Sequence, residues 1–354
     1  MTGASNPEGP EPPAPADAPD GAPGASPSAS NSAWSSRPPG LTTFSLQDRQ
    51  APALFVVGWL ATLLGVALTA TVAFGVPGLA GAALSLASLF ALTAGLVLLA
   101  GSQTIERRSA GAAHAGPSPL LVLIAVLVAT RLLGFLVGTA LLPIADRIPV
   151  ELGDLLGVVL QAVVFFGVIR LTIVGPRVLT WAEMGWHGDR STVLRAIAGG
   201  AVFAGPVILV TAVIANLAVD LVGATPPSPL PPTGTASGLV LHLLAGAAIA
   251  PVAEELLFRG FALTAWRQLA GVRAAIVRSS IVFVLAHVLF VSGDTFGDTV
   301  RVAAVAGIVR IPVAFALGWL FVRTGSIWAP IGLHGAFNGI LIVIAEIAAR
   351  SSPG

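Results

Sequence analysis

The sequence predicts an all-α fold, a polytopic bundle of transmembrane helices, and three observations support this prediction. Of the 354 residues, 55% are hydrophobic and only 10% are charged, whereas soluble domains carry about 25% charged residues. The mean hydropathy is +0.89. From Pro52 onward, apolar runs follow one another, and each is long enough to cross a bilayer as a helix. We therefore expect a multi-pass membrane protein.

The composition also excludes several kinds of chemistry. The chain has no Cys, which excludes disulfides, zinc thiolates and cysteine nucleophiles. It has no Tyr, so one class of general acid is absent as well. The formal net charge is only +1, whereas nucleic-acid binding usually needs a concentrated basic face. We expect no nucleic-acid partner, and the chemistry is left to His, Glu, Asp, Ser, Asn and Arg.

The first 50 residues differ from the rest of the chain. They consist mainly of Pro, Ala, Ser and Gly, a composition too poor in apolar residues to form a core. A signal peptide would begin with a basic segment and an apolar segment, and neither is present here. Residues 1–50 are therefore predicted to be a disordered cytoplasmic tail.

About nine spans are expected after this tail. The N-terminal transmembrane helices, within residues 51–222, are predicted at 53–76, 79–101, 119–142, 151–174 and 194–222. A proline-rich external loop at 223–237 separates them from a C-terminal core at 237–345. The helices of this core are predicted at 238–264, 276–291, 302–322 and 327–349.

The arginines predict the orientation of these spans. If the N-terminus is cytoplasmic, the arginines expected on the inside are Arg37, Arg49, Arg107, Arg108, Arg177, Arg190, Arg267, Arg273 and Arg323. The opposite side keeps only Arg147, Arg301 and Arg350. Because positive residues accumulate in cytoplasmic loops, the N-terminus is predicted inside and the C-terminus outside.

Ionisable residues within spans are costly and are functional candidates by default. The C-terminal core contains such residues on three predicted helices: Glu254, Glu255 and Arg259, then His287, then His334 with Asn338. Counted from the cytoplasmic ends of their spans, Glu254, His287 and His334 all lie at a depth of about 14–16 Å. Asn338 lies one turn further out. Polar residues can also simply hold helices together, but a shared depth favours a common site.

This set of side chains can carry out hydrolysis. A carboxylate in an apolar site can take a proton from water, and a histidine beside it can position that water. A second histidine and an amide can donate hydrogen bonds to an oxyanion. Alternatively, Glu254, His287 and His334 can bind a divalent metal such as zinc, with one position open for water. The sequence leaves both alternatives open, but it contains neither His-Glu-x-x-His nor Gly-x-Ser-x-Gly.

The ordered motifs Glu254-Glu255-x-x-x-Arg259, Phe283-x-x-x-His287 and His334-x-x-x-Asn338 resemble those of the CPBP family of CAAX proteases and bacteriocin-processing proteins, also called Abi. The resemblance covers residues 237–345. It implies an intramembrane endopeptidase, related to type II CAAX prenyl endopeptidases, in which Glu254 activates water with help from His287. His334 and Asn338 would stabilise the oxyanion, while Glu255 and Arg259 support the site.

The implied substrate is a membrane-associated or lipidated peptide or protein. Membrane lipids are expected to surround the helices of the protein. The Lys-free, Gly- and Ala-rich composition indicates a bacterial cytoplasmic membrane. Two alternatives were weighed: a non-catalytic immunity or scaffold protein of the same fold, and an ion-coupled transporter, which predicts inverted repeats that the sequence does not show. Among the remaining polar residues, His242 is expected to hold helices together, and Arg310 to pair with Glu255 or Glu346. His114 and His187 are expected to be solvated.

Overall fold

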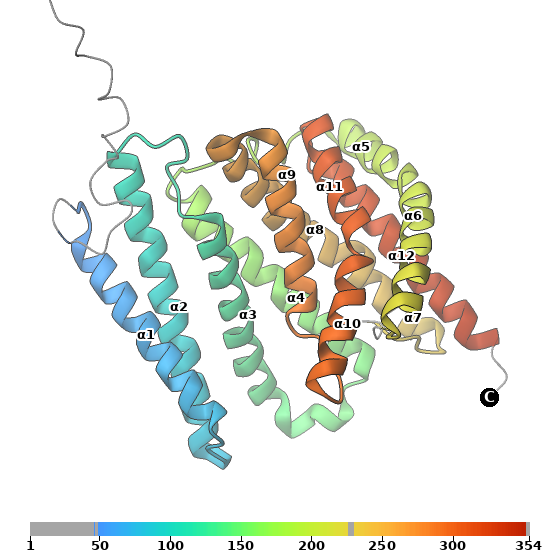
Figure 1. Ribbon diagram of the computed structural model, residues 1–354, viewed down its shortest axis with the longest axis horizontal. Coiled ribbons are helices and arrows are strands. Elements are labelled where there is room, and N and C mark those ends of the chain that lie inside the picture. The colour runs from blue at the N-terminus through green and yellow to red at the C-terminus, as the bar shows by residue number, and fades with distance from the viewer. Residues whose placement is uncertain (1–45, 47–48, 226–229, 352–354) are drawn as a thin grey trace, which may run out of the picture. The chain divides into compact units, whose positions relative to one another are not determined.

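The computed structural model describes residues 46, 49–225 and 230–351. The tail predicted at 1–50 falls outside this part except at residues 46, 49 and 50, and it stays a prediction. Residues 226–229 of the proline-rich loop also lie outside it. Every regular element in the described part is helical (Figure 1).

Five continuous helical stretches and three single helices make up the fold. The single helices are α1 (Pro52–Ala73), α2 (Gly78–Ser109) and α12 (Trp328–Ser351). The composite stretches are α3 (Pro119–Leu141) with the 3₁₀ helix η1 (Leu142–Arg147), α4 (Val150–Ile169) with the π-helix η2 (Arg170–Val174), α5 (Arg190–Val202) with α6 (Ala204–Val222), and α10 (Phe296–Ile308) with α11 (Ile311–Thr324). The fifth consists of α7 (Ala236–Leu243), the π-helix η3 (Leu244–Ile249), α8 (Ala250–Glu255), the π-helix η4 (Leu256–Leu263) and α9 (Thr264–Val288).

The number of spans agrees with the sequence prediction. In the described part of the chain, eight helical stretches are long and apolar enough to cross a membrane. One of them, Ala236–Val288, has 53 residues, about 80 Å of helix, and so is too long for a single crossing of a core about 30 Å thick. Gly271 interrupts it with φ 78° and ψ 174°, which glycine adopts without steric cost. The predicted spans 238–264 and 276–291 lie on either side of this break.

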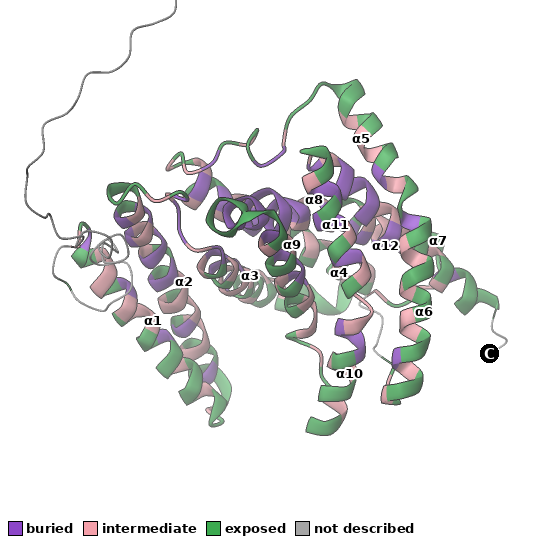
Figure 2. Cartoon of the chain, turned by 45° about the horizontal axis from the view of Figure 1, so that its top comes forward, coloured by how far each residue is buried: buried purple, intermediate pink, exposed green. Residues whose placement is uncertain are grey.

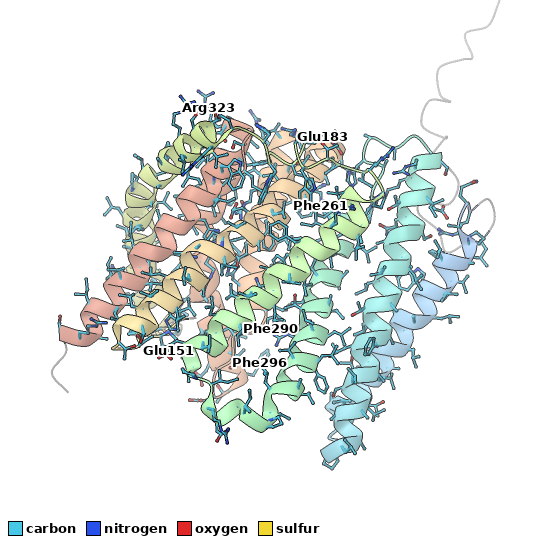
Figure 3. All side chains as sticks on the ribbon, turned by 180° about the vertical axis from the view of Figure 1, so that it is seen from behind. Glu151, Glu183, Phe261, Phe290, Phe296 and Arg323 are labelled. Atoms are coloured by element: carbon cyan, nitrogen blue, oxygen red, sulfur yellow. The ribbon has the colours of Figure 1, made fainter. Side chains whose placement is uncertain are left out.

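The predicted topology also agrees with the structure. Figure 1 shows that α1 begins at the end of the bundle where α12 begins, and that α12 finishes at the opposite end. Figure 3 shows Glu183 and Arg323 at one end, and Glu151 and Phe296 at the other. The helical bundle therefore begins and finishes at opposite ends, as an odd number of crossings requires.

Local sequence signals explain where several helices begin. Proline occupies the first turn of α1 and α3, where its missing N–H leaves no helical hydrogen bond unmade. Thr235 caps α7 by accepting a hydrogen bond from the Gly238 amide at 3.0 Å. Asp189 caps α5 by accepting one from the Thr192 amide at 2.9 Å. Hydrogen bonds from Thr192 and Ser191 hold the pKa of the Asp189 carboxyl below its usual value.

The buried core lies in the C-terminal half of the chain. Figure 2 shows buried residues on α8, α11 and α12, whereas α1 is largely intermediate or exposed, and every residue of η4 is buried. Phe261, Leu263 and Leu317 are fully buried in this core. In contrast, Leu60 and Leu64 of α1 are exposed, as expected for a helix whose outer face contacts lipid rather than water. The core therefore surrounds the helices that carry the polar motifs.

One loop residue differs from the expectation. His114 is 1% exposed and its ring contacts Phe261, with 6.4 Å between ring centroids. Its ring nitrogens lie 3.0 Å from Gln268 Oε1 and 3.2 Å from the Pro117 carbonyl oxygen. The predicted solvation of His114 is therefore wrong, and burial lowers the pKa of its imidazole. His187 is exposed, as predicted.

The contact between α5 and α12 predicts a selective stability effect. A Cβ atom on Gly200 would lie 1.9 Å from the Ala329 carbonyl oxygen, whereas one on Gly199 would meet nothing within 4 Å. Gly200→Ala should therefore lower the free energy of unfolding by about 1–3 kcal/mol through overpacking. Gly199→Ala is the matched control and should be neutral or slightly stabilising. Thermal denaturation in detergent measures both, and equal effects of the two variants would contradict this close approach.

Candidate active site

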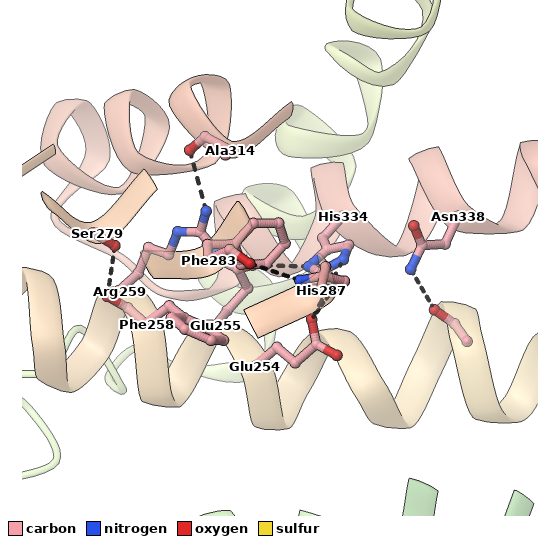
Figure 4. Close-up of polar contacts among 11 residues, drawn as sticks. Glu254, Glu255, Phe258, Arg259, Ser279, Phe283, His287, Ala314, His334 and Asn338 are labelled. Atoms are coloured by element: carbon pink, nitrogen blue, oxygen red, sulfur yellow. Dashed lines mark hydrogen bonds and ion pairs between the residues drawn. The ribbon is translucent and has the colours of Figure 1, made fainter. Parts of the chain in front are cut away.

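Two adjacent glutamates at the end of α8 have different surroundings (Figure 4). Their side chains project about 100° apart around the helix axis. Glu255 is fully buried, whereas the side chain of Glu254 is 13% exposed. The π-helices η3 and η4 flank α8 on both sides, and π-turns within longer helices often occur at functional sites.

Glu255 is the centre of a buried hydrogen-bonded cluster. Its Oε1 atom accepts a hydrogen bond from Arg259 NH1 at 2.8 Å and lies 2.8 Å from His334 Nδ1. Arg259 NH2 donates a further hydrogen bond to the Ala314 carbonyl oxygen at 3.1 Å. These contacts join α8, η4, α11 and α12, and the supporting role of Glu255 and Arg259 stays a prediction.

Phe283 packs against the charged groups of this cluster. Its ring lies 4.4 Å from the Arg259 guanidinium carbon, and its centroid is 4.4 Å from that of His287. The His334 ring meets it edge to face at 5.7 Å. Such packing restricts the orientation of both imidazoles and adds a cation–π interaction with Arg259. The sequence places Phe283 in a motif, but it does not predict that the Phe283 ring packs against Arg259 and both imidazoles.

Glu254 faces both histidines, as the shared depth predicts. Its Oε2 atom lies 3.6 Å from His287 Nε2 and 3.9 Å from His334 Nε2. Both distances are longer than a direct hydrogen bond. The buried Oε2 atom of Glu254 has no hydrogen-bond partner among the described residues. Glu254, His287 and His334, from three separate segments of the chain, therefore surround one point.

The hydrogen-bond partners assign the protons of both rings. His287 Nδ1 lies 2.8 Å from the Phe283 carbonyl oxygen, and His334 Nδ1 lies 2.8 Å from the Glu255 carboxylate. Because both partners only accept, each Nδ1 carries the hydrogen and each neutral ring has a lone pair on Nε2. Both lone pairs are directed toward Glu254. Three acceptors meet there, and only a donor, such as a water molecule, or a cation can satisfy them.

Asn338 lies one turn further along α12 than His334. Its Nδ2 atom donates a hydrogen bond to the Gly246 carbonyl oxygen in η3 at 2.8 Å. That bond uses one of the two hydrogens of the amide group. The predicted contribution of Asn338 to oxyanion stabilisation stays a prediction.

Two other intramembrane residues have partners that bear on the site. His242 Nε2 lies 3.3 Å from Asp154 Oδ2, so it links α7 to α4 as expected. The expected pairing of Arg310 with Glu255 or Glu346 is wrong, because those carboxylates pair with Arg259 and Arg350. Arg310 instead donates to the Ala306 carbonyl oxygen at 2.7 Å.

A cavity of about 1190 Å³ adjoins the catalytic candidates. Glu254 and His287 line it, together with apolar residues of α3, α4 and α9 such as Leu127, Val158 and Leu285. Ligand pockets usually have volumes of about 300–1,000 Å³ and are mostly apolar with a few polar groups. This cavity therefore has room for a large apolar ligand in contact with Glu254.

The spacing of the side chains around Glu254 is wider than the zinc site that the sequence allows. Tetrahedral zinc with bonds of about 2.0–2.1 Å holds its ligands about 3.3 Å apart. The separations of 3.6 and 3.9 Å at Glu254 are wider than this. No group of three or more His, Cys, Asp or Glu side chains in the described chain is arranged to hold a metal ion. We therefore derive no step through a metal.

The helices and this site define a polytopic membrane protein with a buried carboxylate–imidazole centre. Residues 236–340, under a third of the chain, match the family model described as type II CAAX prenyl endopeptidase Rce1-like. This match confirms the resemblance predicted from the motifs: residues 236–340 of this membrane protein are similar to that family. Searches of curated proteins and of solved structures found no match.

The buried ion pair predicts a large stability effect. Arg259→Met leaves Glu255 without its cation, and removing one partner of a buried pair costs about 3–5 kcal/mol of unfolding free energy. The matched control is Arg350→Met, because Arg350 forms the same i,i+4 pair with Glu346 but is 46% exposed. Loss of that partly exposed pair should cost about 1 kcal/mol or less. Thermal unfolding in detergent compares the two, and similar losses would contradict the central role of Arg259.

Proposed function

We propose that this protein is an intramembrane endopeptidase that hydrolyses a peptide bond with water activated by Glu254 and His287. One observation carries the proposal. The unpartnered Oε2 of Glu254 and two imidazole lone pairs meet beside an apolar cavity. A water molecule placed there can donate one hydrogen to the carboxylate and one to an imidazole nitrogen. Such a water is oriented for attack and has a base within reach.

In the proposed reaction, the water oxygen attacks the carbonyl carbon of the scissile bond while Glu254 takes the released proton. Charge then develops on the carbonyl oxygen of the tetrahedral intermediate. Glu254 passes its proton to the nitrogen of the leaving group, and the C–N bond breaks. The products are a new carboxyl terminus and a new amine. The carboxylate acts first as a general base and then as a general acid.

Glu255 and Arg259 support this reaction through His334. If His334 Nε2 takes up a proton from solvent before the attack, the resulting imidazolium still donates its Nδ1 hydrogen to the Glu255 carboxylate, much as a carboxylate stabilises a catalytic imidazolium in serine proteases. In this form, Nε2 donates a hydrogen bond to the oxyanion. The second hydrogen of the Asn338 amide is proposed to do the same. Glu255 and Arg259 thus act as positioning residues.

The proposed substrate is a membrane-associated or lipidated peptide or protein. The apolar lining of the cavity at membrane depth supports this assignment, because a lipid chain or apolar peptide can enter without exposing itself to water. We place the protein in the bacterial cytoplasmic membrane on the basis of its composition.

Cleavage should depend on Glu254 and His287. Glu254→Gln or His287→Ala in purified protein reconstituted in liposomes should lower the cleavage rate of an apolar peptide library by about 10²–10⁴-fold, the usual contribution of general acid–base catalysis. The fragments are quantified by mass spectrometry. Glu346→Gln is the matched control, because this buried glutamate lies on α12 outside the cavity lining. Equal cleavage by the wild type and the Glu254 variant, or no cleavage by any protein, would contradict the proposal.

Removal of metal ions should leave the activity intact. Because the mechanism needs no bound metal, dialysis against EDTA is expected to leave the cleavage rate unchanged, and elemental analysis should find less than one zinc per protein. A loss of activity that zinc restores would instead indicate a metal held by Glu254, His287 and His334, the donor set of a catalytic zinc site.

A further inference from the structure

The start of α9, on both sides of its break at Gly271, carries three arginines that the proposed reaction does not use. Residues 255–266 are all buried, whereas residues 267–273 are all exposed, so the chain leaves the core over this stretch. Figure 1 shows the beginning of α9 at the end of the bundle where α12 begins, which is the side predicted to be cytoplasmic. Arg267, Arg273 and Arg278 are exposed there.

These three arginines lack acidic neighbours. The chain contains neither Asp nor Glu between residues 256 and 293, and the ion pairs of the described residues include none of the three arginines. In contrast, two arginines at the opposite end of the bundle pair with acids of their own helices, Arg301 with Asp298 and Arg350 with Glu346. The start of α9 therefore carries a local excess of positive charge.

Two of the arginines share a helix face with apolar residues that contact lipid. Val277 and Ile281 are exposed, and neither lines the cavity beside Glu254, so in a bilayer they face acyl chains. Arg273 precedes Val277 by four residues and Arg278 precedes Ile281 by three, the spacings at which side chains share a face. Arg273 lies about 12 Å above Ile281 along the helix axis. The two guanidinium groups are thus placed where acyl chains give way to lipid headgroups.

Apolar side chains are also exposed at the tip of this turn. Leu269 is 46% exposed and Val272 is 43% exposed, on either side of the break at Gly271. Exposed apolar residues next to basic ones are typical of segments that lie in the boundary between headgroups and acyl chains. Gln268 Oε1 lies 3.0 Å from the Nδ1 atom of the buried His114, and this contact ties the turn to the loop that follows α2. The turn is therefore held in place at the membrane surface.

We propose that this surface, formed by Arg267, Leu269, Val272, Arg273 and Arg278, binds the phosphate group of anionic phospholipids. The fork of each guanidinium matches phosphate oxygens, and anionic lipids attract basic side chains close to the membrane. A zwitterionic lipid binds less well, because the same arginines repel the cation of its headgroup. None of the five residues lines the cavity beside Glu254, so this lipid site is independent of the proposed function.

Native mass spectrometry of the purified full chain in dodecyl maltoside measures the affinity for single lipids. Dioleoylphosphatidylglycerol is the anionic probe, and dioleoylphosphatidylcholine is the zwitterionic probe with the same acyl chains. The wild type should bind the anionic lipid at least about tenfold more tightly. Arg267→Gln, Arg273→Gln and Arg278→Gln combined should weaken its binding on the order of 100-fold, at about fivefold for each arginine near the membrane surface. Binding of the zwitterionic lipid should not change.

The matched control combines Arg147→Gln, Arg301→Gln and Arg350→Gln, which removes the same charge from the opposite end of the bundle. It should leave the affinity for the anionic lipid unchanged. Lysine at the three α9 positions keeps the charge and should retain most of the affinity. Equal affinities of the wild type and the α9 glutamine variant would overturn the proposal, as would an equal loss in the control or no preference for the anionic lipid.

Two further measurements separate lipid binding from other effects. Without added lipid, the α9 glutamine variant should melt at the wild-type temperature, because the three side chains are exposed and form no ion pair among the described residues. If the combined variant does not fold, Arg273→Gln alone should still weaken binding of the anionic lipid about fivefold. Displacement of this lipid by about 10 mM inorganic phosphate would indicate a site for a soluble anion and would overturn the lipid assignment.

Discussion

The arrangement of the site depends on one buried carboxylate, that of Glu255. A fully buried glutamate is stable as an ion only when it is paired and hydrogen-bonded. Arg259 provides the cation from the next turn, and His334 provides a hydrogen bond from α12, both at 2.8 Å. These two contacts fix α12 against α8. They also fix the proton on His334 Nδ1, so that its other nitrogen is directed toward Glu254.

The two neighbouring glutamates therefore differ in their hydrogen-bond partners. Glu255 has one oxygen bound by two donors, whereas Glu254 keeps an oxygen without a partner next to the cavity. A structural role needs a complete set of partners, whereas the catalytic role proposed for Glu254 needs an incomplete set that water can fill. Phe283 separates and orients the two parts, because its ring contacts Arg259, His287 and His334.

The cavity beside Glu254 combines an apolar lining with a few charged groups. Its walls are mainly apolar, and its charged groups have distinct positions: Glu254 beside the histidines, and Arg131 stacked on Phe290. In a low-dielectric space, separated charges of this kind orient a ligand strongly because little water screens them.

The sequence by itself determined the fold class, the approximate number of spans and the common depth predicted for Glu254, His287 and His334, because hydropathy and helical rise are local properties of the chain. The pairing of Glu255 with Arg259 is also local, since residues four apart share a helix face. Only the tertiary structure decided which helices pack together. That choice buried His114, gave Arg310 a backbone partner in place of a glutamate, and brought Arg131 to the catalytic cavity from α3, more than 120 residues before Glu254 in the sequence. Such contacts join distant segments, and no local pattern specifies them.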